Sequence, residues 1–339
     1  MTIYFYAILT SIFTYYIIYY YRNKIGVLLG VMDKPDEKRK IHKFPTPKTA
    51  SYSIVLTLFV FLLINNFFDI IDSNYNNIIV GSLLIFFVGF FDDKYKLSPS
   101  IKIILVSAII LLLCLSTEDL IIKKFYIYAF DTFFYLEKFS LIFSILCVLC
   151  LINSLNLADG INGLATGIIF FWLIYISHMY GANDNLLIKI LLLNLILILI
   201  HNYKGDHFLG DSGSLMLSSF VALLIIKLNN QSIDDPSHQR SAESILILFL
   251  IPGLDMIRLF IERLIKKKNP TKGDKNHFHH YLINQFSLTK TLLIYLSLVN
   301  LPILISLYTD VNKILLILGI VLIYFLFIFK YKNTKKNNE

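Results

Sequence analysis

Apolar runs separated by short polar stretches make up most of this chain. Eleven runs are candidates for membrane spans, because a transmembrane helix needs about 20 predominantly apolar residues. They cover residues 3–21, 49–68, 78–91, 101–116, 139–156, 163–180, 186–201, 214–228, 242–262, 291–308 and 312–330. The first run has no basic segment before it and no small-residue cleavage site after it, so we expect a retained span rather than a signal peptide. The pattern predicts an all-α polytopic integral membrane protein with about eleven transmembrane helices.

The polar stretches between these runs are too short to hold a soluble domain. The longest are residues 22–48 and 263–290. Any binding or catalytic site must therefore be assembled from loops and span ends. We expect one transmembrane domain over residues 1–330 and a basic tail over residues 331–339.

Composition supports the same fold class. Of the 339 residues, 56% are hydrophobic and 16% are charged, whereas soluble domains have about 45–50% apolar and about 25% charged residues. These values exclude a disordered, collagenous or ordinary cytosolic protein. The 3 cysteines, Cys114, Cys147 and Cys150, all lie inside apolar runs, so we expect neither a disulfide framework nor a zinc knuckle.

Basic residues are distributed unequally between the two sides that alternating spans create. Of the 31 lysines and arginines, 23 fall in the connections after odd-numbered spans and in the tail, and 7 fall on the other side. Because cytoplasmic loops are enriched in lysine and arginine, the first side is assigned to the cytoplasm. This places the N-terminus outside and the C-terminus inside. The net charge of +8 is thus mainly an orientation signal, and we expect no nucleic-acid partner.

The polar clusters of the chain all fall on the cytoplasmic side of this topology. They lie at residues 34–42, 92–94, 153–163, 207–211 and 277–280. The opposite side contains acidic residues, such as Asp234 and Asp235, but no comparable cluster. The distribution predicts a site that faces the cytoplasm.

The chemistry of these clusters suits a phosphate substrate held by magnesium. They combine carboxylates and amides with lysines, arginines and histidines. The carboxylates are Asp92, Asp93, Asp159 and Asp211, and the amides are Asn153, Asn156 and Asn162. Mg²⁺ prefers oxygen ligands and binds through one or two carboxylates together with substrate phosphates. Phosphoryl transfer then requires positioning and charge neutralisation.

Each feature also has a purely structural interpretation. The pair Asp92–Asp93 alone is typical of a solvated turn, and the basic run 34–43 alone is typical of a positive-inside anchor. Three histidines in a basic loop resemble a zinc site, but the cytoplasmic loops lack cysteine and no H-E-x-x-H motif occurs. Asp255 and Arg258, three residues apart in one span, are candidates for an ion pair that holds the bundle together.

Four ordered motifs resemble one known family. They are Asp92–Asp93, NSLNLADGINGL at 153–164, FLGDSGS at 208–214 and HFHH at 277–280. In this order and in these loops, they resemble the polyprenyl-phosphate N-acetylhexosamine-1-phosphate transferases of glycosyltransferase family 4. The resemblance extends over most of the chain, from Asp33 to His280. The eleven-span layout resembles the O-antigen-initiating branch more than the ten-span branch of phospho-MurNAc-pentapeptide translocase.

The resemblance implies transfer of a sugar 1-phosphate from a UDP-sugar to the phosphate of a membrane polyprenol, such as undecaprenyl phosphate, with release of UMP. It implies Mg²⁺ as the cofactor, with Mn²⁺ as the alternative, and an N-acetylhexosamine such as GlcNAc as the sugar. The product would initiate a lipid-linked surface glycan, such as O-antigen, capsule or a teichoic-acid-like polymer. The expected location is the bacterial cytoplasmic (inner) membrane, among membrane lipids, and a homodimer is left open.

The same resemblance implies roles for individual residues. Asp211 would bind the metal, with Asn156 or Asp159. Asp92 would deprotonate or orient the lipid phosphate, and Asp93 would assist. The expected catalytic residues are Asp92, Asp93, Asp159 and Asp211, and the expected substrate-binding residues are Lys34, Arg39, Lys40, His42, Asn153, Asn156, Asn162, His277, His279 and His280. We prefer direct attack by the lipid phosphate to a covalent aspartyl intermediate.

The chain departs from the family pattern at several positions. Many members have Asp where this chain has Asn162, a glycine pair is replaced at Ala50–Ser51, and an arginine before the histidines is replaced at Lys275–Asn276. These changes leave the sugar open, including a deoxy-N-acetylsugar or phospho-MurNAc-pentapeptide donor. A transporter or an inactive scaffold remains a less favoured class, which loss of turnover on replacing Asp92 or Asp211 would exclude.

Overall fold

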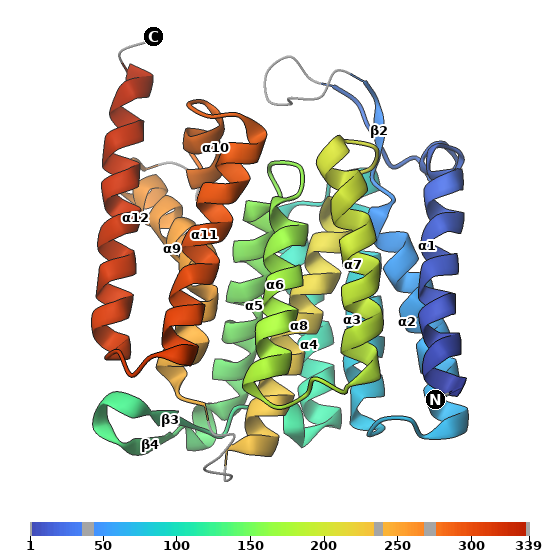
Figure 1. Ribbon diagram of the computed structural model, residues 1–339, viewed down its shortest axis with the longest axis horizontal. Helices are drawn as coiled ribbons and strands as arrows, with labels where there is room; N and C mark the ends of the chain where they lie inside the picture. The colour runs from blue at the N-terminus through green and yellow to red at the C-terminus, as the bar shows by residue number, and fades with distance from the viewer. Residues whose placement is uncertain (1, 36–43, 234–239, 268–275, 337–339) are drawn as a thin grey trace.

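The structure, a computed structural model, describes residues 2–35, 44–233, 240–267 and 276–336. Within these residues the chain forms a helical bundle with two small antiparallel sheets (Figure 1). The helices are α1 (Thr2–Leu29), α2 (Ala50–Phe68), α3 (Asn74–Tyr95), α4 (Pro99–Ser116), α5 (Ser140–Ala158), α6 (Leu164–Met179), α7 (Leu186–Lys204), α8 (Gly210–Ser232), α9 (Ala242–Ile265), α10 (Phe278–Ile283), α11 (Leu288–Tyr308) and α12 (Lys313–Lys336). The strands are β1 (Met32–Asp33), β2 (Thr46–Pro47), β3 (Lys124–Ile127) and β4 (Thr132–Tyr135).

Every predicted span coincides with one long helix, which confirms a polytopic helical membrane protein. Among the described residues, 9 helices are long and apolar enough to cross a membrane. The remaining two long helices are α1, which carries Arg22 and Lys24 near its end, and α6, which has only 16 residues. The number of spans in a bilayer and the orientation of the termini therefore stay predictions. α1 begins and α12 ends at opposite ends of the bundle, as an odd number of crossings requires (Figure 1).

Several helices begin where a polar side chain caps their first turn. The side chains of Ser98, Asn185, Ser241 and Ser287 accept hydrogen bonds from backbone N–H groups at the starts of α4, α7, α9 and α11. Such caps satisfy donors that have no partner within the helix. Pro99 at the first position of α4 adds a preset backbone angle. These residues fix where the loops end, and the loops carry the polar clusters.

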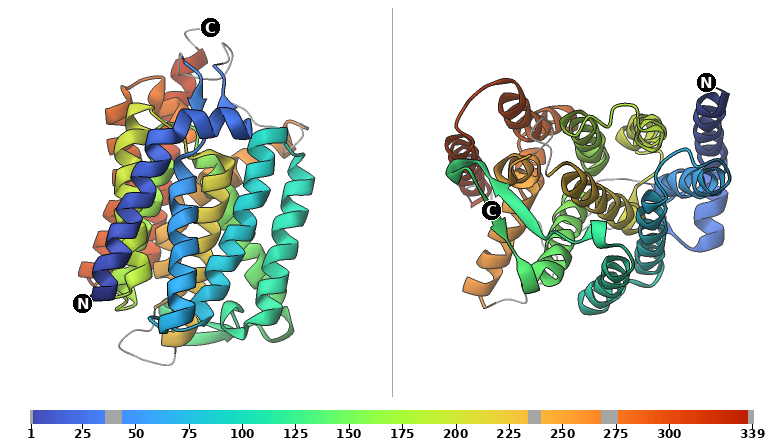
Figure 2. Two further views of the ribbon diagram at one scale, coloured as in Figure 1. Left: turned by 90° about the vertical axis from the view of Figure 1, so that its right-hand side faces the viewer. Right: turned by 90° about the horizontal axis from the view of Figure 1, so that it is seen from below.

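Helix α8 occupies the centre of the bundle (Figure 2). In its most apolar stretch 94% of the residues are buried, compared with 17% for α12. α3 packs directly on α8 because Gly89 has no side chain: a Cβ there would lie 2.5 Å from the backbone oxygen of Asp211. This close approach brings the end of α3, with Asp92 and Asp93, against the start of α8.

The two sheets mark the two ends of the bundle. β1 and β2 pair Met32 with Pro47 at the end that also carries α10, which we name the site end. β3 and β4 form an aromatic hairpin at the other end, which we name the hairpin end (Figure 1). The carboxylate of Glu243 accepts hydrogen bonds from the backbone N–H groups of Tyr128 and Ala129, each at 3.1 Å, and so ties the hairpin to α9.

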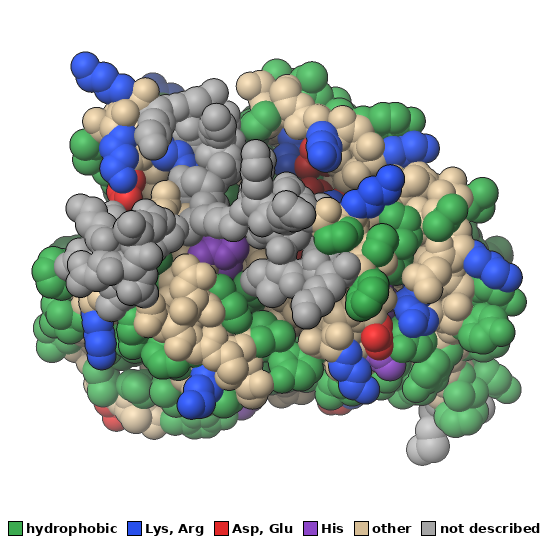
Figure 3. Space-filling view, turned by 90° about the horizontal axis from the view of Figure 1, so that it is seen from above, with side chains coloured by type: hydrophobic (Ala, Val, Ile, Leu, Met, Phe, Trp, Pro, Cys, Tyr) green, Lys and Arg blue, Asp and Glu red, His purple; other side chains and the backbone are tan. Residues whose placement is uncertain are grey.

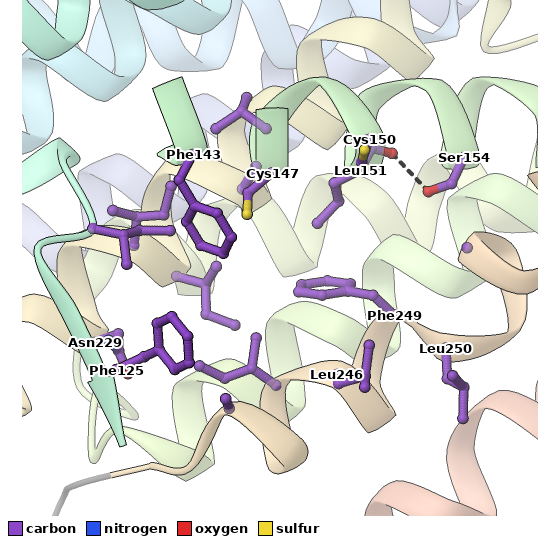
Figure 4. Close-up of a pocket in the computed structure, with 18 of the residues that line it drawn as sticks. Phe125, Phe143, Cys147, Cys150, Leu151, Ser154, Asn229, Leu246, Phe249 and Leu250 are labelled. Atoms are coloured by element: carbon purple, nitrogen blue, oxygen red, sulfur yellow. Dashed lines mark hydrogen bonds between the residues drawn. The ribbon is translucent and has the colours of Figure 1, made fainter. Parts of the chain in front are cut away.

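A cavity of about 720 Å³ opens between α5, α8, α9 and β3. Figure 4 shows the rings of Phe125, Phe143 and Phe249 around this space, with Cys147 on the α5 side. Its lining is almost entirely apolar. Charged phosphate groups require hydrogen-bond donors or cations, so this cavity is not suited to phosphate chemistry.

Candidate active site

A polar cavity of about 860 Å³ lies at the site end of the bundle. Four of the predicted residues line it: Asn156, Asp159, Asn162 and Asp211. Figure 3 looks down on this end and shows histidine near the middle of the face, with lysine and arginine side chains distributed around it. The structure thus brings together polar motifs that are more than 40 residues apart in the chain.

Asp93 caps the start of α8 from a different helix. Its two carboxylate oxygens accept hydrogen bonds from the backbone N–H groups of Asp211 and Ser212, at 3.0 and 2.9 Å. Gly210 permits this contact, because its φ of +72° suits glycine and a Cβ would lie 2.7 Å from Asp93 Oδ2. With its side chain 1% exposed, Asp93 is placed to position Asp211 rather than to meet a substrate.

Lys48 completes the environment of Asp93. Its Nζ lies 2.9 Å from Asp93 Oδ1. Burial opposes the charged form of this lysine, but the negative charges of Asp93 and then Asp211 outweigh burial and raise the pKa of Lys48 above its ordinary value. Lys48 also lines the polar cavity, so it provides a permanent positive charge beside the carboxylates.

Asp92 and Asp211 share a second lysine. Lys102 Nζ lies 2.6 Å from Asp92 Oδ2 and 3.6 Å from Asp211 Oδ1. Asp92 is buried, whereas 30% of the Asp211 side chain is exposed. Asn156 donates a hydrogen bond of 2.6 Å to the same Asp211 oxygen. Asp211 is therefore more accessible than Asp92 and Asp93, and it is held in place by the ammonium group of Lys102 and the amide of Asn156.

Asp159 follows α5 directly and faces the same cavity. Burial, followed by the negative charges of Asp211 and Asp93, raises the pKa of Asp159 well above its usual range. Such clustering of acids is typical of a site that takes a cation, because a bound cation favours the ionised carboxylates. The described residues contain no group of three or more His, Cys, Asp or Glu side chains placed to hold a metal. Mg²⁺ requires only one or two carboxylates with substrate phosphates, so Asp159, Asp211 and the amide of Asn156 fit this ion.

The histidine motif packs against the Asp159–Gly160 turn. His277 and His279 are buried, and their rings stack with centroids 5.4 Å apart. A Cβ on Gly160 would overlap Nε2 of His279, so only glycine allows the ring to lie there. Burial, and then the neighbouring His280 and His277, lowers the pKa of His279 well below its ordinary value. A neutral His279 thus forms part of the wall behind the cavity.

Other predicted residues do not line the cavity or lie outside the described residues. Asn153 donates a hydrogen bond of 2.8 Å to the carbonyl of Leu149 in its own helix and does not line the cavity. Lys34 is exposed just beyond β1. Arg39, Lys40 and His42 lie outside the described residues.

Three residues of the site, Lys48, Lys102 and Asn202, were not identified from the sequence. Lys48 and Lys102 were counted only as part of the positive-inside signal. A lysine inside the apolar first turn of α4, nine residues after Asp93, was the available indication for Lys102. Asn202 accepts a hydrogen bond from the N–H of Gly163 at 2.6 Å and donates one to the carbonyl of His207 at 2.8 Å. It joins the two motif loops, and the only indication in the sequence was an amide directly after the apolar run 186–201.

Comparison with known proteins agrees with this geometry. The family model described as "Glycosyl transferase family 4" matches residues 75–229. A protein of Bacillus subtilis (strain 168), named probable undecaprenyl-phosphate N-acetylglucosaminyl 1-phosphate transferase, is 28% identical over 294 residues, covering 82% of this chain and 76% of its own length. The Thermotoga maritima protein named undecaprenyl-phosphate alpha-N-acetylglucosaminyl 1-phosphate transferase is 27% identical, covering 78% of this chain and 77% of its own. An Escherichia coli (strain K12) protein of the same name is 24% identical, covering 81% of this chain and 75% of its own. With its four motifs near one cavity, the chain is thus similar to glycosyl transferase family 4 over residues 75–229.

Proposed function

We propose that this enzyme transfers N-acetylglucosamine 1-phosphate from UDP-N-acetylglucosamine to undecaprenyl phosphate. The transfer of a sugar 1-phosphate to undecaprenyl phosphate is supported by the names of its relatives. The observation that carries the proposal in this chain is the pair Asp92 and Asp211, which share Lys102 beside a polar cavity at a bundle end. A lipid acceptor must present its phosphate at the edge of the bilayer, and a bundle end is where that edge lies.

The residues divide into an acceptor side and a donor side. Asp92, held by Lys102 at the junction of α3 and α4, would orient the lipid phosphate and accept its proton. Asn156, Asp159 and Asp211 would hold Mg²⁺, which neutralises the donor pyrophosphate when bound. Asn162 and His280 would hold the sugar and phosphates of the donor, and the buried rings of His277 and His279 would support the Asp159–Gly160 turn from behind.

Direct transfer needs no covalent enzyme intermediate. An oxygen of the lipid phosphate forms a bond to the β-phosphorus of the UDP-sugar. The bond from that phosphorus to the oxygen bridging the two phosphates breaks, and UMP leaves with the bridging oxygen. Lys48 and Lys102 would offset the negative charge that gathers on the phosphates, which is the main requirement of phosphoryl transfer.

The further parts of the proposal concern location and pathway. The distribution of basic residues supports a multi-pass protein of the bacterial cytoplasmic membrane with its site facing the cytoplasm. The product would initiate a lipid-linked surface glycan. A homodimer remains a prediction.

The test is UMP release by the purified full-length protein in detergent with Mg²⁺ and undecaprenyl phosphate. The donors compared are UDP-GlcNAc, UDP-GalNAc and UDP-linked deoxy-N-acetylsugars. We expect release that requires both the lipid and Mg²⁺ and is fastest with UDP-GlcNAc. Release with a different donor would correct the sugar, and no release from folded protein with any donor would refute the proposal.

A further inference from the structure

Three side chains form a charged node inside the bundle, below the histidine motif: Asp255 and Arg258 of α9 and Tyr324 of α12. Arg258 donates a hydrogen bond of 2.7 Å to Asp255 Oδ1, and the Tyr324 hydroxyl donates one of 2.7 Å to the same oxygen. The Nε of Arg258 donates to the Tyr324 oxygen at 2.8 Å. All three residues are at most 7% exposed. Burying charges at membrane depth is costly, and such residues commonly serve a function.

The node contacts the main chain on both sides of His277. Both carboxylate oxygens of Asp255 accept from the N–H of Phe278, at 3.1 and 3.2 Å. Arg258 donates to the carbonyl of Asn276 at 2.6 Å. The ring of His277 also contacts the node, since its Nδ1 lies 3.3 Å from Asp255 Oδ2. An ion pair that only joined two helices would not need these contacts with residues 276–278.

A series of direct contacts leads from the node to the cavity. The His277 ring stacks on His279 with an interplanar angle of 14°. His279 in turn packs on Gly160, which lines the polar cavity beside Asp159. The acceptor side of the site, Asp92 with Lys102, belongs to α3 and α4 and does not take part in this series.

We propose that Asp255 and Arg258 are positioning residues for the donor side of the active site. They hold residues 276–278 so that the rings of His277 and His279 form the wall behind the Asp159–Gly160 turn. This inference rests on the proposed function for its kinetic consequence, but the placement of the segment is measurable without turnover.

The first measurement is hydrogen–deuterium exchange of full-length Asp255→Asn by mass spectrometry. We expect amide exchange in residues 276–280 to be at least about 10-fold faster than in wild type, because the acceptor of the Phe278 N–H is weakened. The matched control is Asp72→Asn, which removes the acid from a 2.6 Å ion pair with fully buried Lys227 at the hairpin end. This control should leave exchange in residues 276–280 unchanged. Unchanged exchange in Asp255→Asn, or equal acceleration in both variants, overturns the proposal.

The second measurement is steady-state UMP release with each substrate varied in turn. Asp255→Asn should raise the KM for the UDP-sugar about 10-fold and lower kcat about 10-fold, in the range known for residues that orient ligands indirectly, while the KM for undecaprenyl phosphate stays within about twofold. Mere loss of folded protein would lower the apparent kcat and leave both KM values unchanged, and that result overturns the proposal. Inactivity of the wild type would refute the proposed function, and the exchange experiment would still decide the positioning.

The double variant Asp255→Asn/Arg258→Gln tests whether the pair acts by holding residues 276–278 or only by neutralising its own two charges. It removes both charges of the pair, and Glu262, the other acid 2.8 Å from Arg258, is 21% exposed and can be solvated, so the melting temperature should recover relative to Asp255→Asn. The KM for the UDP-sugar should stay raised, because the partners of residues 276–278 remain weakened. Recovery of the wild-type KM would mean that the pair acts through neutrality alone and would overturn the proposal.

Discussion

The ring of His279 lies directly on Gly160, where a Cβ would overlap its Nε2. The two residues are more than 100 positions apart in the chain, and they join the second motif to the histidine motif. A methyl group at position 160 must displace the ring, because the other side of His279 is buried.

Gly160→Ala should therefore lower kcat/KM for the UDP-sugar about 10- to 100-fold, as expected when a positioned group is displaced. Gly319→Ala is the matched control, since a Cβ there meets nothing within 4 Å. The control should keep full activity, with a slightly raised melting temperature because alanine favours the helix. Equal activity of the two variants would contradict the packing described for His279.

Removal of the Asp211 carboxylate should strongly reduce turnover without unfolding the protein. Asp211→Asn should lower kcat at least about 100-fold, as is typical for loss of a key electrostatic group, and the residual activity should need about 10-fold more Mg²⁺. Stability should be kept, because Asp211 adds to the repulsion that raises the pKa of Asp159. Kinetics and melting curves in detergent check both points. Asp310→Asn, at an exposed acid of the hairpin end, is the control, and an active Asp211→Asn would contradict the assigned role.

The cap that Asp93 provides to α8 should be measurable as stability. Asp93→Asn should lower the free energy of unfolding by about 1–3 kcal/mol, because two backbone donors and Lys48 lose a charged partner. The double variant with Lys48→Met should lose less than the sum of the single variants, because the lysine is no longer left unpaired. Asp184→Asn breaks an exposed ion pair and should change stability by less than about 1 kcal/mol. Equal effects of Asp93→Asn and Asp184→Asn would argue against the cap.

His207 should make folding sensitive to acid. Burial lowers the pKa of His207 from 6.5 to about 3, so the folded state holds the ring neutral while the unfolded state binds a proton below pH 6.5. Stability from this residue is thus complete above pH 6.5 and is lost as the pH falls, by about 2 kcal/mol at pH 5. His207→Phe should flatten the decrease in melting temperature between pH 7 and pH 5, whereas His178→Phe, at an exposed histidine, should not. Parallel curves for wild type and His207→Phe would contradict this assignment.

The helices were largely predictable, since bilayer thickness sets the length of an apolar run. The start of α8 was not: the apolar pattern predicted residue 214, but the helix begins at Gly210. Gly210, Asp211 and Ser212 are small or polar, so the apolar pattern did not include them, and in the structure Asp93 caps this first turn from across the bundle. A hydrogen bond between distant parts of the chain cannot be predicted from the local pattern of apolar residues.

The acids of the site were noticed in the sequence because acids at the ends of apolar runs are conspicuous. Lys48 and Lys102 were not distinguished, since lysine at the same ends is what orientation alone requires. Asn202 was missed for a different reason, because it directly follows the apolar run 186–201 and the sequence does not reveal what lies opposite it. The ion pair between Asp255 and Arg258 was predicted, but its contacts with Tyr324 and residues 276–278 were not.

The central place of α8 bears on how the chain is assembled in the cell. α8 exposes almost no surface to lipid, and much of its first half is serine and glycine. Among the described residues, the helices that pack most extensively against it are α3 and α5, with α2 and α6 beside them. All four precede α8 in the chain, so the ribosome has already delivered its neighbours when α8 emerges. The insertion machinery can therefore release α8 directly against helices that are already inserted, instead of into the lipid acyl chains.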